Sequence, residues 1–441
     1  MLEFYYCRWI LLHFCWLLIN ILEDKVTGKA ERVVVTGMGI ASPLGCDLTR
    51  FWSELLAGHS GVDSLSDDIF SDLPLRLGAS VRGYDESQYF DGKELKRMSR
   101  SSQLGLVAAE QAISTAKLKN GGVDFKEVGI LVGSSIGGFS ASDPSFKSYH
   151  TRGRLSTFTI PISMNVGPGA NISIRYGFQG ILVDVDAACS TAAHSIGYAF
   201  NMIRSGILQV AVTGAADCPF SPAVVAAWMA LHAVSNRVDC PSEACRPFSA
   251  DRDGMVLGEG AGILVVEAES HALRRGAPIL AEIKGYGASA DSSHLTQPSQ
   301  DGPVMAMRRA LSDAEMATND IDYINAHATG TEWNDKNETK AIKEVFGEHS
   351  YKIPVVGNKA AFGHSIAGSG ALELIGCILS LRDQIVPPTI NYKVPDPECD
   401  LDYVTEGSRK LPLRNIMSNS FAFGGSNAVL IVGKYEPDEQ P

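Results

Sequence analysis

Cys189 follows a buried-strand pattern and precedes a helix-forming stretch, in the sequence ILVDVDAACSTAAHSIGYAF. This context predicts a thiol at a strand-to-helix turn, where free backbone N–H groups and the positive end of the helix dipole lie close by. A thiol with an ordinary pKa of about 8.5 is only about 3% ionised at neutral pH. A dipole worth roughly 0.3–1 kcal/mol shifts that pKa by less than one unit, so a nearby imidazole is needed to make a strong nucleophile. Taken alone, Cys189 can equally be a small core residue.

Two histidine motifs favour the chemical interpretation. His327 lies in INAHATGTEWND just after a predicted strand, and Lys359 and His364 lie in GNKAAFGHSIAGSG. Loops that follow the strands of an α/β sheet meet at one edge, where ligand sites form. A single such histidine is usually structural, but two histidines and a cysteine favour a shared nucleophilic site. A last motif, SNSFAFGGSNAVLIV, places Phe423 before two glycines that either aim a backbone N–H at a reacting carbonyl or form a plain β-turn.

Strands and helices that could position these residues alternate along the chain. Apolar, β-branched runs predict strands at residues 32–36, 128–132, 181–186, 210–213, 262–267, 279–284, 321–326, 353–356 and 428–432. Helix-period stretches lie between many of them, at residues 102–116, 192–203, 303–314 and 370–382. This alternation predicts an α/β fold with largely parallel sheets that are buried on both faces.

Two strand openings look alike, RVVVTGMG from residue 32 and LAEIKGYG from residue 280, and each starts a new series of strands and helices. We therefore expect two similar halves that pack tightly, since no low-complexity linker separates them. The expected divisions are a hydrophobic extension at 1–30, a half with the cysteine at 31–275, a half with the histidines and lysine at 276–436, and a tail at 437–441.

The composition narrows the class of protein. The 441 residues include 38 Lys and Arg against 50 Asp and Glu, a net charge of −12, with 45% hydrophobic residues. This is typical of a globular chain and argues against a nucleic-acid binder, which needs a basic face. The nine cysteines are scattered and form no CxxC pair. We therefore expect no metal site and no disulfide framework, but reduced thiols in the cytoplasm.

Residues 4–22 are strongly hydrophobic but are interrupted by Arg8, His13 and Asn20. The segment is long enough to span a bilayer, yet it lacks the basic start and cleavage site of a secretory signal. A membrane anchor, a helix packed on the body or a partner, and a misassigned start codon all fit. We favour the last two, since nothing later in the chain needs a membrane.

The order and spacing of Cys189, His327, Lys359, His364 and the Phe423 motif resemble the elongating β-ketoacyl-[acyl-carrier-protein] synthases of the thiolase-like superfamily. The resemblance covers nearly the whole chain after the N-terminal segment. It implies a five-layered α/β fold of two similar halves, with the active site between them. It also implies an acyltransferase that elongates an acyl thioester on the cysteine by two carbons, through decarboxylative Claisen condensation with malonyl-carrier protein, in fatty-acid or polyketide-type biosynthesis.

The resemblance also assigns roles to residues. His327 and His364 match the histidines that serve decarboxylation and stabilise the enolate, and Lys359 matches the lysine beside them. The backbone N–H groups of Cys189 and Phe423 match an oxyanion hole, and the Phe423 side chain matches a gate of the acyl pocket. The supporting matches are carboxylates around the lysine (Asp335, Glu338), candidate ligands of a structural monovalent cation (Glu373, Asn325) and hydroxyls for the phosphopantetheine arm (Thr296, Thr329, Thr331).

Several positions depart from the family pattern and leave every catalytic side chain in place: Ala328, Asn334, Ala360, Ala361, Ala422 and the VDAACST sequence around the cysteine. They suggest a specialised synthase rather than the housekeeping enzyme. The main alternative is a non-catalytic, chain-length-factor-like partner of a ketosynthase heterodimer, although such subunits normally lack the cysteine. A thiolase would carry a second cysteine in the last motif, an initiating synthase would use one histidine, and a papain-like protease would not need the Lys359–His364 loop.

The expected partners follow from the resemblance. We expect a homodimer and an acidic acyl carrier protein, which brings the phosphopantetheine arm, so no free cofactor is needed. Docking should use a local basic patch, and Lys93, Lys96, Arg97 and Arg100 in DGKELKRMSRSS are candidates. A solvated helix face explains those charges at least as well.

Overall fold

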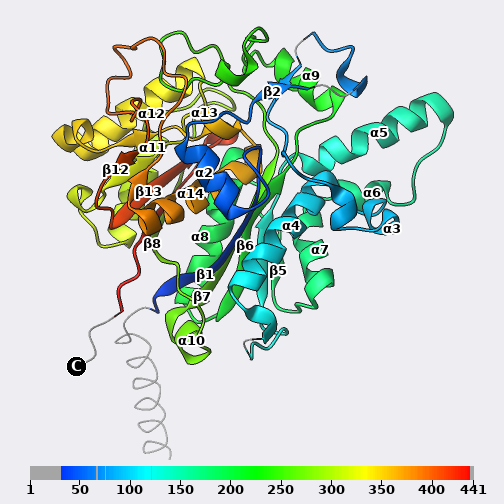
Figure 1. Cartoon of the computed structure of the whole chain (residues 1–441), viewed down its shortest axis with the longest axis horizontal. Helices are drawn as coiled ribbons and strands as arrows, with labels where there is room; N and C mark the ends of the chain where they lie inside the picture. Colours follow the sequence, from blue (N-terminus) through cyan, green and yellow to red (C-terminus); the bar gives the residue numbers. More distant parts are fainter. Residues whose placement is uncertain (1–30, 66–67, 75, 121, 438–441) are drawn as a thin grey trace, which may run out of the picture. The chain divides into compact units, whose positions relative to one another are not determined.

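The structure is a computed structural model that describes residues 31–65, 68–74, 76–120 and 122–437, and Figure 1 shows the unit that begins at Arg32. The hydrophobic segment at residues 4–22 lies outside the described residues. Within the described ranges, no helix is both long and apolar enough to cross a membrane.

One sheet of ten strands forms the centre of this unit. Its order is β10-β9-β13-β14-β8-β1-β7-β6-β4-β5. The strands are β1 (Val33–Ala41), β4 (Gly129–Gly133), β5 (Leu182–Val183), β6 (Val210–Asp217), β7 (Gly260–Ala268), β8 (Ala281–Ala290), β9 (Tyr323–Asn325), β10 (Val355–Val356), β13 (Asn415–Phe421) and β14 (Ser426–Gly433). All nine residues of β1 are buried, as its continuous apolar sequence requires.

The sheet consists of two halves with the same topology. In each half the strands lie in the order first, fifth, fourth, second, third, and the halves join where β1 pairs antiparallel with β8. This repeat confirms the prediction of two similar halves. We propose that the boundary between them lies between α10 (Glu269–Arg274) and β8.

The expectation of largely parallel sheets is wrong. Within each half two strand pairs are parallel, namely β4 with β5 and β6, and β9 with β10 and β13. The pairs that involve β1, β7, β8 and β14 are antiparallel. The tight turn between β13 and β14 can only connect antiparallel neighbours. Strand β13 has no match among the predicted strands, because its centre is the polar but buried sequence Ser418–Asn419–Ser420.

Helices form the other layers, and the site depends on two of them. Helices α8 (Thr191–Arg204) and α14 (Ser369–Asp383) pack against each other and against strands of both halves, so they form the central layer. Helices α4 (Arg100–Thr115) and α7 (Gly167–Tyr176) cover the first half on its other face, and α11 (Asp301–Asp313) and α12 (Glu332–Phe346) cover the second (Figure 1). The result is the five-layered arrangement predicted from the resemblance.

Further helices complete the fold. They are α2 (Leu48–Leu56), α3 (Gly92–Leu95), α5 (Gly137–Arg152), α6 (Thr159–Ser163), α9 (Pro222–Ala230) and α13 (Lys359–Phe362). Two further two-stranded sheets pair β2 (Asp63–Ser64) with β3 (Leu77–Gly78) and β11 (Ile385–Val386) with β12 (Arg409–Lys410).

Candidate active site

The structure places Cys189 at the predicted turn, between β5 and the first residue of α8. The preceding residue, Ala188, has φ +49°, a left-handed conformation that costs a non-glycine residue roughly 1–2 kcal/mol. Two other non-glycine residues beside the site are left-handed as well, Ala328 and Ile366. Strain of this kind persists only where the surrounding structure enforces it. The turn therefore holds the thiol at a fixed position.

Burial controls the ionisation of the thiol. Cys189 is 7% exposed, and burial raises its pKa to about 11. Lys359 and the backbone N–H groups of Phe423 and Cys189 lower this pKa, but less than burial raises it. The effect of burial therefore outweighs the expected effect of the helix terminus, which favours the thiolate. The resting thiol is protonated. Attack on a thioester needs a group that takes the thiol proton.

Alkylation of Cys189 should report this raised pKa. Because only the thiolate reacts, the rate of iodoacetamide modification should rise about tenfold per pH unit from pH 7 to 10. Peptide mapping after timed quenching measures that rate at Cys189. A rate that levels off below pH 9 would show that the thiol has a much lower pKa.

His327 lies in the loop between β9 and α12 and is held from two sides. Glu338 accepts hydrogen bonds from the N–H groups of His327 and Ala328, both at 2.8 Å. The ammonium of Lys359 donates to the His327 carbonyl at 2.6 Å and lies 3.4 Å from Nδ1. An ammonium can only donate, so Nδ1 is the acceptor and Nε2 carries the proton. His327 is therefore fixed as a hydrogen-bond donor towards the pocket.

His364 lies between α13 and α14 and is pinned to the first half of the molecule. Its N–H donates to Val256 O at 2.7 Å, and its carbonyl accepts from Gly258 N at 2.8 Å. Nδ1 lies 2.9 Å from Ser369 Oγ, a hydroxyl that can donate or accept. Nε2 is buried and has no partner among the described residues. This nitrogen is free to accept a proton or to donate to a substrate oxygen.

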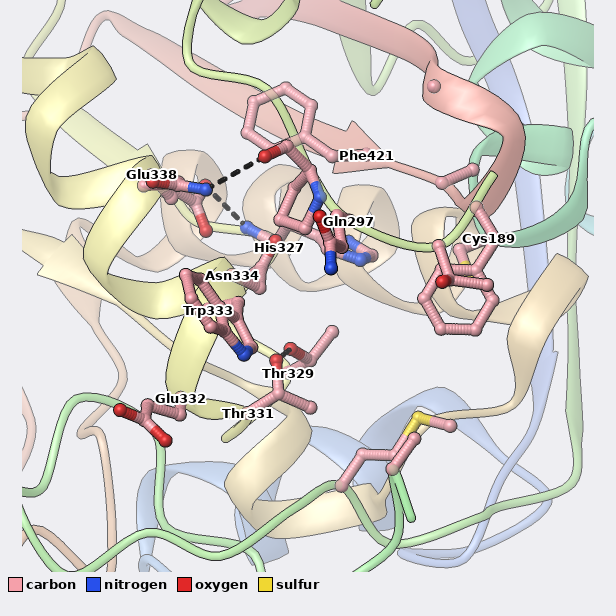
Figure 2. Close-up of a pocket in the computed structure, with 18 of the residues that line it drawn as sticks. Cys189, Gln297, His327, Thr329, Thr331, Glu332, Trp333, Asn334, Glu338 and Phe421 are labelled. Carbon is pink, nitrogen blue, oxygen red and sulfur yellow. Dashed lines mark hydrogen bonds between the residues drawn. The ribbon is translucent and has the colours of Figure 1, made fainter. Parts of the chain in front are cut away.

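The cysteine and the two histidines converge on one pocket. The sulfur of Cys189 and one nitrogen of each ring lie within 4.8 Å of one another, and the two rings meet at 83° with centroids 5.5 Å apart. Burial, followed by the charge of Lys359, lowers the pKa of both histidines well below its usual value, so both rings are neutral. The three residues line a cavity of about 410 Å³. Figure 2 labels Cys189 and His327 in this pocket.

These donor types would also suit a metal ion such as zinc. The ammonium of Lys359 beside His327 opposes a divalent cation at this position, because two positive charges would share a buried site. The arrangement therefore fits a nucleophile beside two neutral imidazoles better than a metal centre.

The buried ammonium of Lys359 has a different partner from the expected ones. Its ion pair is with Glu373 of α14, with 2.5 Å between Nζ and Oε1 and both side chains fully buried. Asp335 accepts hydrogen bonds from the N–H groups of Phe248 and Gly330, and Glu338 holds the His327 loop. Lys359 therefore pairs directly with Glu373, while the expected carboxylates Asp335 and Glu338 bind the backbone of the neighbouring loops.

Glu373 and Asn325, the expected cation ligands, are both buried. Glu373 Oε2 and the Oδ1 atom of Asn419 accept no hydrogen bond from the described residues, whereas Asn325 Oδ1 accepts one from Asn358 at 2.7 Å. Unpaired buried oxygens call for a compensating group. Two buried oxygens near the site, one on Glu373 and one on Asn419, thus lack a hydrogen-bond partner among the described residues.

The three threonines all line the pocket, from two different loops. Thr329 and Thr331 share a hydrogen bond of 2.8 Å at the start of α12, whereas Thr296 is exposed in the loop after β8. Figure 2 shows Thr329 and Thr331 beside the indole of Trp333. Arg252 holds this loop by donating to the carbonyls of Thr331 and Glu332, both at 3.2 Å.

Phe423 lies opposite the cysteine, in the turn between β13 and β14. Its backbone N–H faces the Cys189 thiol, and its ring stacks on Trp228 of α9 with centroids 5.9 Å apart. Gly425 has φ +74°, and a Cβ there would lie 2.6 Å from Asp291 Cβ, so glycine is required. This turn and the cysteine turn present two backbone N–H groups to one sulfur.

Sequence reasoning missed several residues that shape the site, among them Ser369, Arg252, Trp228 and Asp217. Asp217 is fully buried and accepts backbone N–H groups from both halves, including Ile136 at 3.2 Å and Ala367 at 3.3 Å. Asp217 ends β6, four residues beyond the strand predicted at 210–213, so no local signal in the sequence pointed to it. Partners of this kind become visible only once the two halves are packed.

The chain matches the β-ketoacyl synthase N-terminal domain over residues 30–272 and the C-terminal domain over residues 280–393. It is 40% identical to nodulation protein E of Rhizobium meliloti (strain 1021), over 91% of this chain and 98% of that protein. It is 39% identical to 3-oxoacyl-[acyl-carrier-protein] synthase 2 of Synechocystis sp., over 92% of this chain and 99% of that protein.

Solved structures agree with these matches. A β-ketoacyl synthase from Burkholderia phymatum is 34% identical with a TM-score of 0.85, and the ishigamide ketosynthase/chain length factor is 32% identical with a TM-score of 0.87. Each alignment covers 92% of this chain and 100% of the other. From its site, its repeated fold and these matches, the chain belongs to the β-ketoacyl synthase family and is an acyltransferase of the ketosynthase type.

Proposed function

We propose that the protein condenses malonyl-carrier protein with an acyl chain held as a thioester on Cys189, and releases a β-ketoacyl product two carbons longer. The observation that carries this proposal is the convergence of one thiol, two neutral imidazoles and two backbone N–H groups on one cavity. The test is an elongation assay with acyl- and malonyl-carrier protein. One CO₂ should form per β-ketoacyl product, and CO₂ without product, or neither, would contradict the proposal.

In the first step, Cys189 Sγ attacks the thioester carbonyl. A bond forms between sulfur and the carbonyl carbon, and the negative charge on oxygen is met by the N–H groups of Cys189 and Phe423. The bond to the carrier sulfur then breaks, and the thiol proton passes to that sulfur. His364 is the residue that would move this proton, because its Nε2 is unpartnered and one of its ring nitrogens lies within 4.8 Å of Sγ.

In the second step, the malonyl group loses its carboxylate as CO₂, and the electrons of that bond form an enolate on the thioester. His327, fixed as an Nε2–H donor by Lys359, and His364 donate to the enolate oxygen. Neutral donors suit this role because their protons stay on the rings. The enolate carbon then attacks the acyl group on Cys189, and the sulfur leaves as the thiolate, which takes a proton from water.

The substrates bring their own prosthetic arm, so we propose no free cofactor. Thr296, Thr329 and Thr331 would bind the amides of a phosphopantetheine arm, since hydroxyls both donate and accept. A monovalent cation would be held by Glu373 and Asn325 and would keep the loop around His327 rigid. As part of this proposal we place the enzyme in the cytoplasm, where its free thiols stay reduced.

We propose that carrier protein docks on basic residues around α3. Lys93, Lys96 and Arg97 are exposed, and Arg97 lies over the Phe158 ring at 5.3 Å. Arg152 and Arg154, which precede Phe158 in the chain, are exposed as well. None of these five makes an ion pair with a described residue. Arg100 is a poor docking residue, because it already pairs with Glu259 at 2.8 Å.

Reversing the charge of Lys93, Lys96 and Arg97 to glutamate should raise KM for carrier-bound substrates roughly tenfold, because exposed charges contribute about 0.2–1 kcal/mol each. The rate with acyl-pantetheine, which lacks the carrier protein, should not change. Lys126→Glu, an exposed lysine elsewhere, is the matched control. An equal loss with both substrates would place the defect in the active site rather than in docking.

We propose a homodimer that forms at the β5 edge of the sheet. β5 is the last strand in the order, and α7 packs beside it, followed by α6 and then α5. These helices expose Ile174, Ile160 and Phe139 by 62–81%. An exposed apolar face of this kind beside an unpaired strand edge suits a second copy of the same chain.

Ile160→Lys combined with Val183→Lys should convert the dimer to a monomer, because two buried charges would lie in the interface. Analytical ultracentrifugation measures the mass, with Leu273→Lys as an exposed control on α10. A monomeric wild-type protein would contradict the homodimer. A stable complex with a second ketosynthase-like chain would support a heterodimer, the arrangement named for the ishigamide ketosynthase/chain length factor.

A further inference from the structure

A buried histidine outside the pocket lies close behind the nucleophile. His194, on α8, is 6% exposed and follows Cys189 by five residues. Nε2 lies 2.9 Å from Ser426 Oγ, and Nδ1 lies 2.6 Å from Tyr286 Oη. A neutral ring satisfies two such partners, one as donor and one as acceptor. Burial lowers the pKa of His194 to about 4, so the ring is neutral at physiological pH.

Ser426 links this histidine to both turns of the oxyanion hole. It is the first residue of β14, directly after the glycine turn that carries Phe423, and its carbonyl accepts from Ala422 N at 3.0 Å. Its hydroxyl also lies 3.3 Å from that of Ser190, the neighbour of Cys189. One serine therefore contacts the cysteine turn, the phenylalanine turn and His194.

Tyr286, the other partner of His194, belongs to the second half of the molecule. Tyr286 lies on β8, and its ring packs so closely on α8 that a Cβ at Gly197 would lie 2.4 Å from it. The series Ser190–Ser426–His194–Tyr286 thus ties α8, from the first half, to β8 and β14, from the second.

We propose that His194 is a positioning residue, which acts through Ser426 to keep the N–H groups of Cys189 and Phe423 at the spacing that acyl transfer needs. The two donors come from different halves of the molecule, so a small shift of one half relative to the other moves the two N–H groups apart. A misplacement of about 1 Å can reduce a rate roughly a hundredfold. This inference rests on the proposed function, because it presumes a thioester oxyanion at Cys189.

The test compares two reactions of the same thiol. Acylation by acyl-carrier protein passes through an oxyanion, whereas alkylation by iodoacetamide does not. Ser426→Ala and His194→Ala should each slow acylation at least tenfold and leave the alkylation rate within about twofold. His194→Asn, which keeps a hydrogen-bonding side chain, should recover part of the loss. Ser289→Ala removes a similar half-buried hydroxyl from β8 and should change neither rate.

Each outcome separates the inference from the function on which it rests. A wild-type protein that is alkylated but never acylated would refute the proposed function. If Ser426→Ala were acylated as fast as the wild type, the positioning role would be refuted. Equal losses of acylation and alkylation would also refute it, because they would show a general disturbance of the thiol. Ser426→Ala removes a single hydroxyl, so it keeps the test valid if His194→Ala does not fold.

Discussion

Replacement of Cys189 by alanine should abolish both acylation of the protein and formation of the β-ketoacyl product. No other described cysteine shares the pocket with the two histidines, so no other thiol can take over the covalent step. The fold should tolerate the change, because the side chain is small and buried at a turn that the backbone maintains. Intact-protein mass after incubation with acyl-carrier protein measures acylation, and product analysis measures turnover.

Cys245→Ala is the matched control for this variant. Cys245 is fully buried in the same apolar cluster as Cys189 but does not line the cavity. The Cys245→Ala variant should be acylated at Cys189 like the wild type. Condensation that survives in Cys189→Ala would show that no acyl-enzyme forms on this residue, and the account of the first step would be lost.

Replacement of His327 or His364 by alanine should reduce decarboxylation of malonyl-carrier protein by roughly 10²–10³-fold, the usual effect of removing one preorganised oxyanion donor. Acylation of Cys189 should fall much less than decarboxylation, because the two backbone N–H groups that serve acyl transfer remain. The difference should be largest in His327→Ala. The double variant should lose less than the product of the two single effects, since the rings act on one oxygen. Release of CO₂ and the rate of mass gain measure the two steps separately.

His349→Ala is a suitable control, since His349 is a partly buried histidine in another part of the second half. It should change neither step. If His327→Ala slowed acylation and decarboxylation by the same factor, the two histidines would not stabilise the enolate separately from the oxyanion of acyl transfer.

Much of the site was predictable because its signals are local. Cys189 was placed at a strand-to-helix turn by the apolar strand, the small residues and the helix pattern in one stretch of sequence. The glycine-rich loops of His327 and His364 were recognisable for the same reason. The repeat of the two strand openings predicted the two halves, and the identical strand order in each half confirms it.

Other features depend on packing across the whole chain and could not be read from local sequence. Lys359 pairs with Glu373 rather than with Asp335 or Glu338, because α14 crosses the centre of the molecule and α12 does not. Burial raises the pKa of the Cys189 thiol more than the helix terminus lowers it. Strand β13 carries polar residues that face buried partners, so its sequence lacks the usual apolar pattern.

The proposed function depends on an acyl chain that is carried on Cys189 and then extended. Intact-protein mass spectrometry with peptide mapping tests it most directly, with carrier proteins bearing chains of two to sixteen carbons followed by malonyl-carrier protein. We expect an acyl mass gain on the peptide that contains Cys189, and its loss as a product two carbons longer when malonyl-carrier protein is added. A folded protein that gains no acyl mass from any chain, or gains it at another residue, would contradict the account and favour the partner-subunit role.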